Sequence, residues 1–332
     1  MFNYIKINNI KGLKECFLNN LGKICVLCGK NNSGKTTILE GIENDKSFSY
    51  GMQINKEIIE KFVNNTKGRL PFGGRTEGIY KKEVNKLLSS EKVWFSDQST
   101  FFVEKLNSIL KKKFSKHIFP SAVFKQHFDN FFNKQKTSIL LPPKRHIERK
   151  TTIETHQEIK PDGEGVLNRL LNWKNKPINS EKYQIYYELL NAFNRVTNGY
   201  KFDVVTDEGE NGGENTISLQ FTDNGKNYRF ADDCGLGLQD IIVILFFSLN
   251  PKYNLLLIEE PESHIHPEMQ RRLLNQFKNN ISTNKQFILS THSNIFLDLR
   301  CTPFLVPLSN VNSVVSCDET KSAQGLPSVS YN

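Results

Sequence analysis

One segment, residues 29–36 with the sequence GKNNSGKT, constrains the fold more than any other part of the chain. The apolar run KICVLCG leads into it, and residues 35–43, KTTILEGIE, continue with a helical pattern. The apolar run has the composition of a strand that is buried on both faces. A strand, a glycine-rich loop and a helix in direct succession predict an α/β fold with a parallel sheet.

The same eight residues match the pattern G-x-x-x-x-G-K-[ST] of a phosphate-binding loop. Gly29 and Gly34 permit a backbone path whose N–H groups converge on phosphate oxygens at the positive end of the next helix. We expect Lys35 to neutralise the β- and γ-phosphates and the Thr36 hydroxyl to ligate magnesium. The other predicted nucleotide contacts are Asn31, Asn32, Ser33 and Thr37.

A second apolar run, residues 255–262 with the sequence LLLIEEPE, predicts a buried strand that ends in acidic side chains. Acids often end strands at a surface, so the run is ambiguous alone and gains meaning beside a phosphate-binding loop. Glu259 is then expected to hold magnesium, and Glu260 to act as general base on the attacking water.

A third run, FILSTHS at residues 287–293, places His292 at the end of the strand that follows the acidic pair. A lone histidine is most often structural. At this position we expect His292 to hydrogen-bond the γ-phosphate. Lys144 and Arg145, after a double proline, are further candidates for a phosphate or dimer contact.

The rest of the chain divides into helical and strand-rich stretches. Residues 44–137 predict a mainly helical insertion, and residues 104–136 contain eight Lys against one Glu and one Asp. This basic stretch is either a solvated face or a contact for nucleic acid or an acidic partner. Residues 164–198 predict helices, residues 201–230 an antiparallel β subdomain, and residues 308–332 a short polar tail after one domain that spans residues 1–307.

Bulk composition limits the class of protein. The chain has 332 residues, 38% of them hydrophobic, and lacks an apolar run near the length of a membrane span. Its N-terminus lacks the apolar stretch of a signal peptide, so we expect a cytoplasmic protein without membrane contact, with its six cysteines unpaired. The net charge of +9 favours polyanionic partners, although Lys and Asn are abundant throughout.

Together these motifs resemble the ATPase heads of the ABC superfamily, in particular its SMC-like and OLD-like branch. The matching segments are GKNNSGKT, LLLIEEPESHIHP, STHS and residues 232–239, DDCGLGLQ. The resemblance implies an ABC-ATPase head, with a P-loop parallel sheet core, an antiparallel β subdomain and a helical insertion. It also implies ATP and Mg²⁺ as ligands, hydrolysis to ADP and phosphate, and a homodimer or higher homo-oligomer.

In these relatives, residues 232–239 correspond to a signature segment that contacts the nucleotide of the opposite subunit. Gly235 and Gly237 are then expected to present backbone N–H groups to that nucleotide. This sequence departs from the pattern because no Ser occupies the cap. Asp232 or Asp233 is the remaining side chain that could cap the helix, and a carboxylate there would repel a phosphate.

Three functions remain open. OLD-like proteins carry a nuclease domain after the ATPase, and the residues after 307 are too few for one. The resemblance therefore favours the stand-alone ATPase subunits of bacterial antiphage systems, Septu-like, retron-associated or OLD-type, which regulate a separate effector such as a nuclease. The alternative is a RecF- or SMC-like DNA repair ATPase that binds DNA through the basic insertion. A nucleotide-locked scaffold that hardly turns over is the third.

Overall fold

The computed structural model of the protein describes most of the chain outside the predicted insertion and the C-terminus. The described residues are 2–11, 13–43, 48–53, 94–95, 137–148, 150–154, 157–208, 215–223, 225–279, 285–297, 301–305 and 314–317.

A five-stranded parallel sheet forms the core. Its strands are β3 (Ile24–Cys28), β6 (Ser138–Leu141), β11 (Leu255–Glu259), β12 (Gln286–Ser290) and β13 (Thr302–Leu305), in the spatial order β13-β3-β12-β11-β6. Every neighbouring pair runs parallel. The predicted apolar runs are the buried strands β3, β11 and β12. Because all five strands point the same way, the residues after each strand gather at one edge of the sheet.

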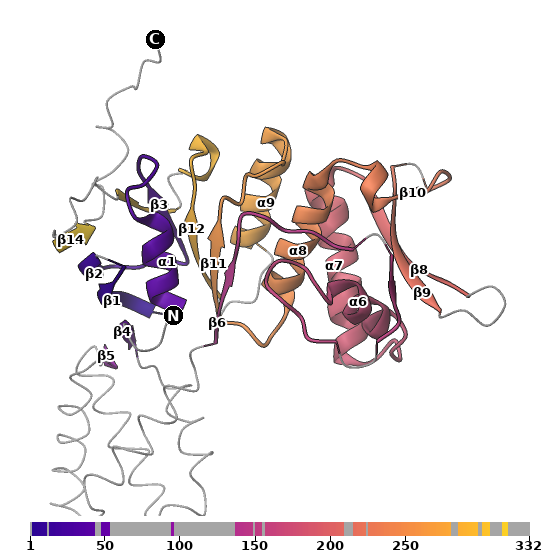
Figure 1. Cartoon of the computed structure of the whole chain (residues 1–332), viewed down its shortest axis with the longest axis horizontal. Coiled ribbons are helices and arrows are strands. Elements are labelled where there is room, and N and C mark those ends of the chain that lie inside the picture. The colour runs from indigo at the N-terminus through magenta and orange to yellow at the C-terminus, as the bar shows by residue number, and fades with distance from the viewer. Residues whose placement is uncertain are drawn as a thin grey trace, which may run out of the picture.

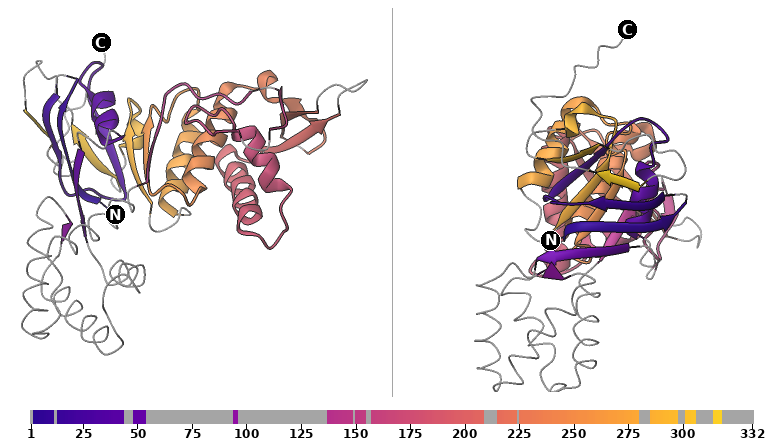
Figure 2. Two further views of the ribbon diagram at one scale, coloured as in Figure 1. Left: turned by 60° about the horizontal axis from the view of Figure 1, so that its bottom comes forward. Right: turned by 90° about the vertical axis from the view of Figure 1, so that its left-hand side faces the viewer.

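One face of the core sheet is covered by α1 (Lys35–Glu43), which also packs against a second, N-terminal sheet (Figure 1). That sheet has the order β14-β2-β1-β4-β5, from strands β1 (Phe2–Ile10), β2 (Leu13–Leu18), β4 (Phe48–Gln53), β5 (Trp94–Phe95) and β14 (Val314–Cys317). Figure 2 shows its strands side by side. The helix approaches closely at Gly41, where a Cβ atom would lie 2.5 Å from Ile7 Cγ2.

A buried glutamine ties the two sheets together. Gln286, at the start of β12, donates from Nε2 to the carbonyls of Phe2 and Gly22 at 2.9 and 2.7 Å. Its Oε1 accepts the Phe2 N–H at 2.8 Å. All three bonds lie between segments that are far apart in sequence, so this amide fixes the N-terminal strand against the core.

Helices cover the opposite face, and a third sheet lies beyond them (Figure 1). The helices are α8 (Leu236–Leu249), α9 (Pro267–Asn279), α7 (Glu181–Thr197) and α6 (Val166–Lys174). The outer sheet contains β7 (Lys150–Thr152), β8 (Lys201–Asp207), β9 (Thr216–Thr222) and β10 (Arg229–Phe230). The other three strands each pair antiparallel with β9. The predicted antiparallel subdomain and helical region are therefore both present.

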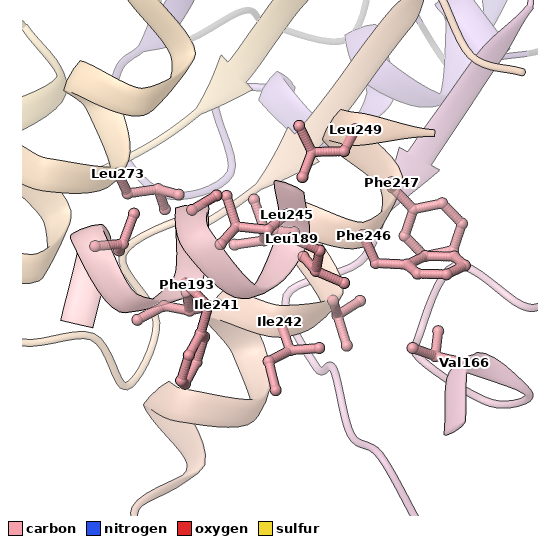
Figure 3. Packing of buried hydrophobic residues seen from close by; sticks show 14 of the residues in the cluster. Val166, Leu189, Phe193, Ile241, Ile242, Leu245, Phe246, Phe247, Leu249 and Leu273 are labelled. Carbon is pink, nitrogen blue, oxygen red and sulfur yellow. The ribbon is translucent and has the colours of Figure 1, made fainter. Parts of the chain in front are cut away.

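Helix α8 runs through the middle of this half of the molecule. All but one of its residues are buried, which matches the apolar sequence on every side of it. Figure 3 shows Ile241, Leu245 and Phe246 packed among side chains of α6, α7 and α9. Phe246 stacks on Trp173 with ring centroids 4.9 Å apart. The helix is thus held rigidly, and its N-terminus is fixed relative to the core sheet.

Capping residues explain where helix α7 begins and ends. Helix α7 starts at Ser180, whose hydroxyl accepts the Tyr183 N–H at 3.2 Å, and it ends at Asn198 in a left-handed conformation with φ 60°.

Two predicted segments differ in part from the structure. Within residues 44–137, the described residues 48–53 and 94–95 are strands of the N-terminal sheet, and the predicted basic helices of residues 104–136 lie outside the described residues. Within the predicted tail, Val314–Cys317 forms β14 and pairs parallel with β2. Among the described residues, no helix has both the length and the apolar character that crossing a membrane requires.

Candidate functional site

The phosphate-binding pattern lies at the carboxyl edge of the core sheet, between β3 and α1. Gly34 has φ +96°, and the position of an added Cβ meets no atom within 4 Å, so the space beside this residue is open. Asn32, with φ 60°, also adopts a left-handed conformation. These dihedral angles curl the loop around the first turn of α1, whose leading N–H groups have no partner inside the helix.

Lys35 reaches into this loop. Its Nζ donates to the carbonyls of Gly29 and Lys30 at 2.8 and 3.0 Å, and the residue is 7% exposed. Burial is the largest influence on the pKa of Lys35 and lowers it, while the carboxylates of Glu260 and Glu262 raise it. The ammonium group is therefore a desolvated positive charge that faces the acidic end of β11.

The remaining loop residues suit an anionic, magnesium-bound ligand. The Ser33 hydroxyl is buried and has no hydrogen-bond partner within the described part of the chain. Thr36 and the side chains of Asn31 and Asn32 are exposed, and Thr37 is half-buried. A buried, unpartnered hydroxyl beside free helix N–H groups and an ammonium is the chemistry that phosphate oxygens satisfy.

The acidic pair lies one strand away from the loop. Strand β12 separates β3 from β11, so the ends of β3 and β11 are about 10 Å apart at ordinary strand spacing. Glu259 ends β11 and is half-buried, whereas Glu260 is exposed. Glu260 has φ 42° and donates its N–H to the Ser290 carbonyl at 2.8 Å. This strained turn directs the chain out of the sheet directly beside the end of β12.

Arg145 holds the backbone of this acidic pair. Its guanidinium donates to the carbonyls of Glu259 and Glu260 at 2.9 and 3.0 Å, and to that of Pro142 at 2.7 Å. Its Nε lies 3.3 Å from Asp240 Oδ1, and both side chains are fully buried. The predicted phosphate or dimer contact is therefore wrong for Arg145, because its donors are used inside the protein; Lys144 is exposed.

Asp240 links this arginine to the loop after the acidic strand. Its second carboxylate oxygen lies 3.0 Å from Nδ1 of His264. Burial raises the pKa of the Asp240 carboxyl, and Arg145 and His264 oppose that shift. Since Asp240 lies in the first turns of α8, the network connects the start of that helix to the residues predicted to do chemistry.

His292 lies in the turn directly after β12, and this turn is hydrogen-bonded to β3 on one side and to the loop after β11 on the other. The N–H of Thr291 donates to the carbonyl of Leu27 in β3 at 3.3 Å. On the other side, Glu262 Oε1 accepts the N–H of His292 at 2.6 Å. The His292 side chain is exposed. The structure thus gathers the loop, the acidic pair and His292 at one edge of the sheet.

Gly235 and Gly237 lie elsewhere, at the start of α8. Gly235 is the N-cap residue, and within the described part of the chain no side-chain cap hydrogen bond is present there, so neither Asp232 nor Asp233 occupies the cap position. A pocket of about 190 Å³ lies beside it, lined by residues that include Arg229, Asp233 and Cys234. Nothing among the described contacts joins this segment to the phosphate loop of the same chain.

The two glycines differ in what a side chain would meet, which gives a matched pair of variants. A Cβ on Gly237 would lie 2.3 Å from the His264 carbonyl oxygen, whereas one on Gly235 would meet nothing within 4 Å. We expect Gly237→Ala to lower the free energy of unfolding by about 1–3 kcal/mol, and Gly235→Ala to lower it by less than about 0.5 kcal/mol. Urea denaturation followed by circular dichroism measures both; equal effects would show that the close backbone approach is absent.

Sequence reasoning missed three residues that organise the site, namely Arg145 in its present role, Asp240 and Glu262. Glu262 had a visible signal, since it is the third acid of the EEPE segment. Asp240 had a weaker one, as the one charged residue of the largely apolar helix α8.

Comparison with known proteins now places the chain. A family model described as "AAA domain, putative AbiEii toxin, Type IV TA system" matches residues 24–298. The chain belongs to this family. The match includes the phosphate loop, the acidic pair and His292, so the chain is a P-loop ATPase of the AAA-domain family by descent.

The chain is also similar to curated proteins. The chain is 24% identical to the Septu protein PtuA of Bacillus thuringiensis, over 98% of this chain and 79% of that protein. It is 37% identical to the OLD nuclease of Thermus scotoductus, over 26% of this chain and 17% of that protein. The similarity to PtuA thus runs through nearly the whole chain, and the similarity to the OLD nuclease covers one part of it.

Solved structures align over most of the chain at low similarity. They include the SMC head domain from Thermotoga maritima, with 10% identity and a TM-score of 0.44, over 97% of this chain and 99% of that chain. Another is the SmcHead bound to the C-winged helix domain of ScpA, with 11% identity and a TM-score of 0.44, over 92% of this chain and 94% of that chain. Scores this low support no inference about function, and the α/β fold rests on the sheets themselves.

Proposed function

We propose that this protein binds ATP with Mg²⁺ and hydrolyses it to ADP and phosphate. The observation that carries the proposal is the position of the Lys35 ammonium, inside a phosphate loop and within electrostatic reach of Glu260 across one strand. Membership of a P-loop ATPase family supports it.

Each site residue has a proposed role. Lys35 and the N–H groups of residues 29–37 bind the phosphates. Glu260 accepts a proton from the attacking water, and His292 hydrogen-bonds the γ-phosphate. The Thr36 hydroxyl and the Glu259 carboxylate are hard oxygen donors of the kind that hold Mg²⁺, which supplies positive charge to the phosphate oxygens when bound.

We propose further that the competent form is a homodimer or a higher homo-oligomer. Gly235 and Gly237 lie at the start of α8, away from α1 and the phosphate loop of their own chain (Figure 1), and among the described residues this helix start has no side-chain cap. Uncapped N–H groups at a helix start bind anions, so this segment suits a nucleotide held by a second copy. Light scattering is expected to show dimers that form with ATP and Mg²⁺ and dissociate after hydrolysis.

At the level of the cell, we propose that the ATPase regulates a separate effector, a nuclease, in bacterial antiphage defence. Similarity to a Septu protein over 98% of the chain supports this, together with the resemblance of its motifs to such systems. Affinity purification of the tagged protein from its native host tests it. A nuclease that co-purifies in a nucleotide-dependent way is expected, and purification without any effector would contradict the regulatory role.

The second candidate is direct DNA binding, as in RecF- or SMC-like repair ATPases. The excess of lysine in residues 104–136 favours it. Affinity for DNA that falls steeply with salt, and falls again when these lysines are neutralised, would support this function over the first.

Turnover itself separates an ATPase from a nucleotide-locked scaffold. Phosphate release by the full-length protein, with ATP and Mg²⁺, is expected to depend on protein concentration because two copies form the site. Binding of ATP without phosphate release would support the scaffold.

A further inference from the structure

Glu262 joins the loop after β11 to the turn after β12. Its Oε1 accepts the N–H groups of His292 and Ser293 at 2.6 and 3.2 Å, and its Oε2 accepts the Thr291 hydroxyl at 2.7 Å. These three hydrogen bonds from consecutive residues to one carboxylate hold the turn at residues 291–293 against the loop after β11. Bonds to an ionised acceptor are stronger than neutral ones and leave little freedom in the turn.

Further bonds extend this arrangement to both neighbouring elements. Thr291 Oγ1 also accepts the N–H of Ser293 at 2.9 Å, and the Ser293 hydroxyl donates to Gln270 of α9 at 2.7 Å. The N–H of Thr291 donates to Leu27, directly before the phosphate loop. The turn therefore lies between the phosphate-loop strand and the acidic loop, and Glu262 is its link to the acidic side.

Glu262 and Glu260 are placed for different tasks. Both oxygens of Glu262 accept hydrogen bonds from the turn, so neither is directed at a reacting water. Glu260 is exposed, and its Oε2 accepts a bond from the Ser263 hydroxyl at 3.2 Å. Since its two oxygens are bonded to two backbone N–H groups and one hydroxyl of the turn, Glu262 is placed to orient that turn.

We infer that Glu262 is a positioning residue that fixes the turn at residues 291–293, so that His292 is presented to the phosphate loop. It acts through His292 and does not touch the reacting atoms. The inference rests on the proposed ATPase function and deepens it, because it makes the third acid of the EEPE segment necessary for the rate and dispensable for nucleotide binding.

Two conservative variants test the inference in the full chain. Glu262→Gln keeps the shape but replaces one accepting oxygen with an amide NH₂, and Thr291→Val removes the hydroxyl donor with little change in volume. We expect Glu262→Gln to lower kcat by roughly 10- to 100-fold, with the Kd for ATP within about threefold of wild type. Thr291→Val is also expected to lower kcat, by a smaller factor than Glu262→Gln, because it removes one of the three hydrogen bonds to Glu262. Glu268→Gln is the matched control, since Glu268 is exposed on α9 and outside the site, and it should leave kcat unchanged.

A double-mutant cycle with His292→Ala separates positioning from a structural role. If Glu262 acts through His292, adding Glu262→Gln to His292→Ala lowers kcat by no more than about twofold. Multiplicative losses in the double variant, or loss of ATP affinity in Glu262→Gln, would overturn the inference while leaving the ATPase function intact. A wild-type protein that releases no phosphate would overturn the proposed function, and this inference with it.

Discussion

Glu260→Gln is expected to lower the rate of phosphate release by at least about 100-fold, while the Kd for ATP stays within about threefold of wild type. The amide matches the carboxylate in size but cannot accept a proton from water. The backbone at this residue is held by Arg145 and by the Ser290 carbonyl, so the substitution leaves the turn in place. Single-turnover phosphate release and equilibrium ATP binding measure the two quantities separately.

The same variant tests the proposed assembly. When hydrolysis is blocked, ATP-bound dimers are expected to accumulate, and light scattering at fixed ATP would show more dimer for Glu260→Gln than for wild type. Phosphate release at the wild-type rate would exclude Glu260 as the general base. A slow variant that stays monomeric with ATP would contradict the shared site while leaving the base assignment intact.

Arg145→Ala is expected to lower the free energy of unfolding by roughly 3–5 kcal/mol, because it leaves the buried Asp240 carboxylate without its cationic partner and with His264 alone beside it. It also removes the donors that hold the carbonyls of Glu259 and Glu260, so the surviving folded protein should hydrolyse ATP slowly. Urea denaturation gives the change in stability. Lys144→Ala is the matched control, because Lys144 is adjacent to Arg145 in the sequence but its side chain is exposed. It should change the free energy of unfolding by less than about 0.5 kcal/mol.

A second substitution distinguishes the buried charge from lost packing. Asp240→Asn in the Arg145→Ala background removes the buried charge that has lost its arginine, and it should restore part of the lost stability. If the Arg145→Ala variant were as stable as wild type, the guanidinium would not stabilise the backbone at Glu259 and Glu260. If the added Asp240→Asn made no difference, the loss would come from the cavity alone.

Elements with strong local patterns could be predicted from the sequence. Helix α1 starts and ends where the motif and the KTTILEGIE pattern place it. Strands β11 and β12 were visible as apolar runs that end in polar residues. In each of these cases the periodicity within one segment determines the structure.

Features that depend on distant partners could not be predicted in this way. Strand β14 is four residues long, and its conformation depends on pairing with β2, in which Val314 lies opposite Glu15. Strand β4 lies in a Lys- and Phe-rich stretch that reads as helical, and its pairing with β1 decides its conformation. In both cases tertiary pairing outweighs local propensity.

The site residues also divide into those that a local motif identifies and those that depend on distant partners. The phosphate loop, Glu259, Glu260 and His292 follow motifs, so the sequence places them. Arg145 was misread because a basic residue after a strand resembles a phosphate contact, and its true partner, Asp240, lies 95 positions away in the sequence. The connections between motifs became visible once the sheet order brought the strand ends together.

Equilibrium binding of ATP in the presence of Mg²⁺ tests the central claim most directly, because the claim is that Lys35 and its loop hold a triphosphate. Lys35→Met, which keeps most of the side-chain volume, is compared with Lys182→Met, a change at an exposed lysine of α7. We predict that wild type and Lys182→Met bind ATP with equal affinity and that Lys35→Met binds at least about 30-fold more weakly. Equal affinity of Lys35→Met and wild type, or no binding by wild type, would contradict the account.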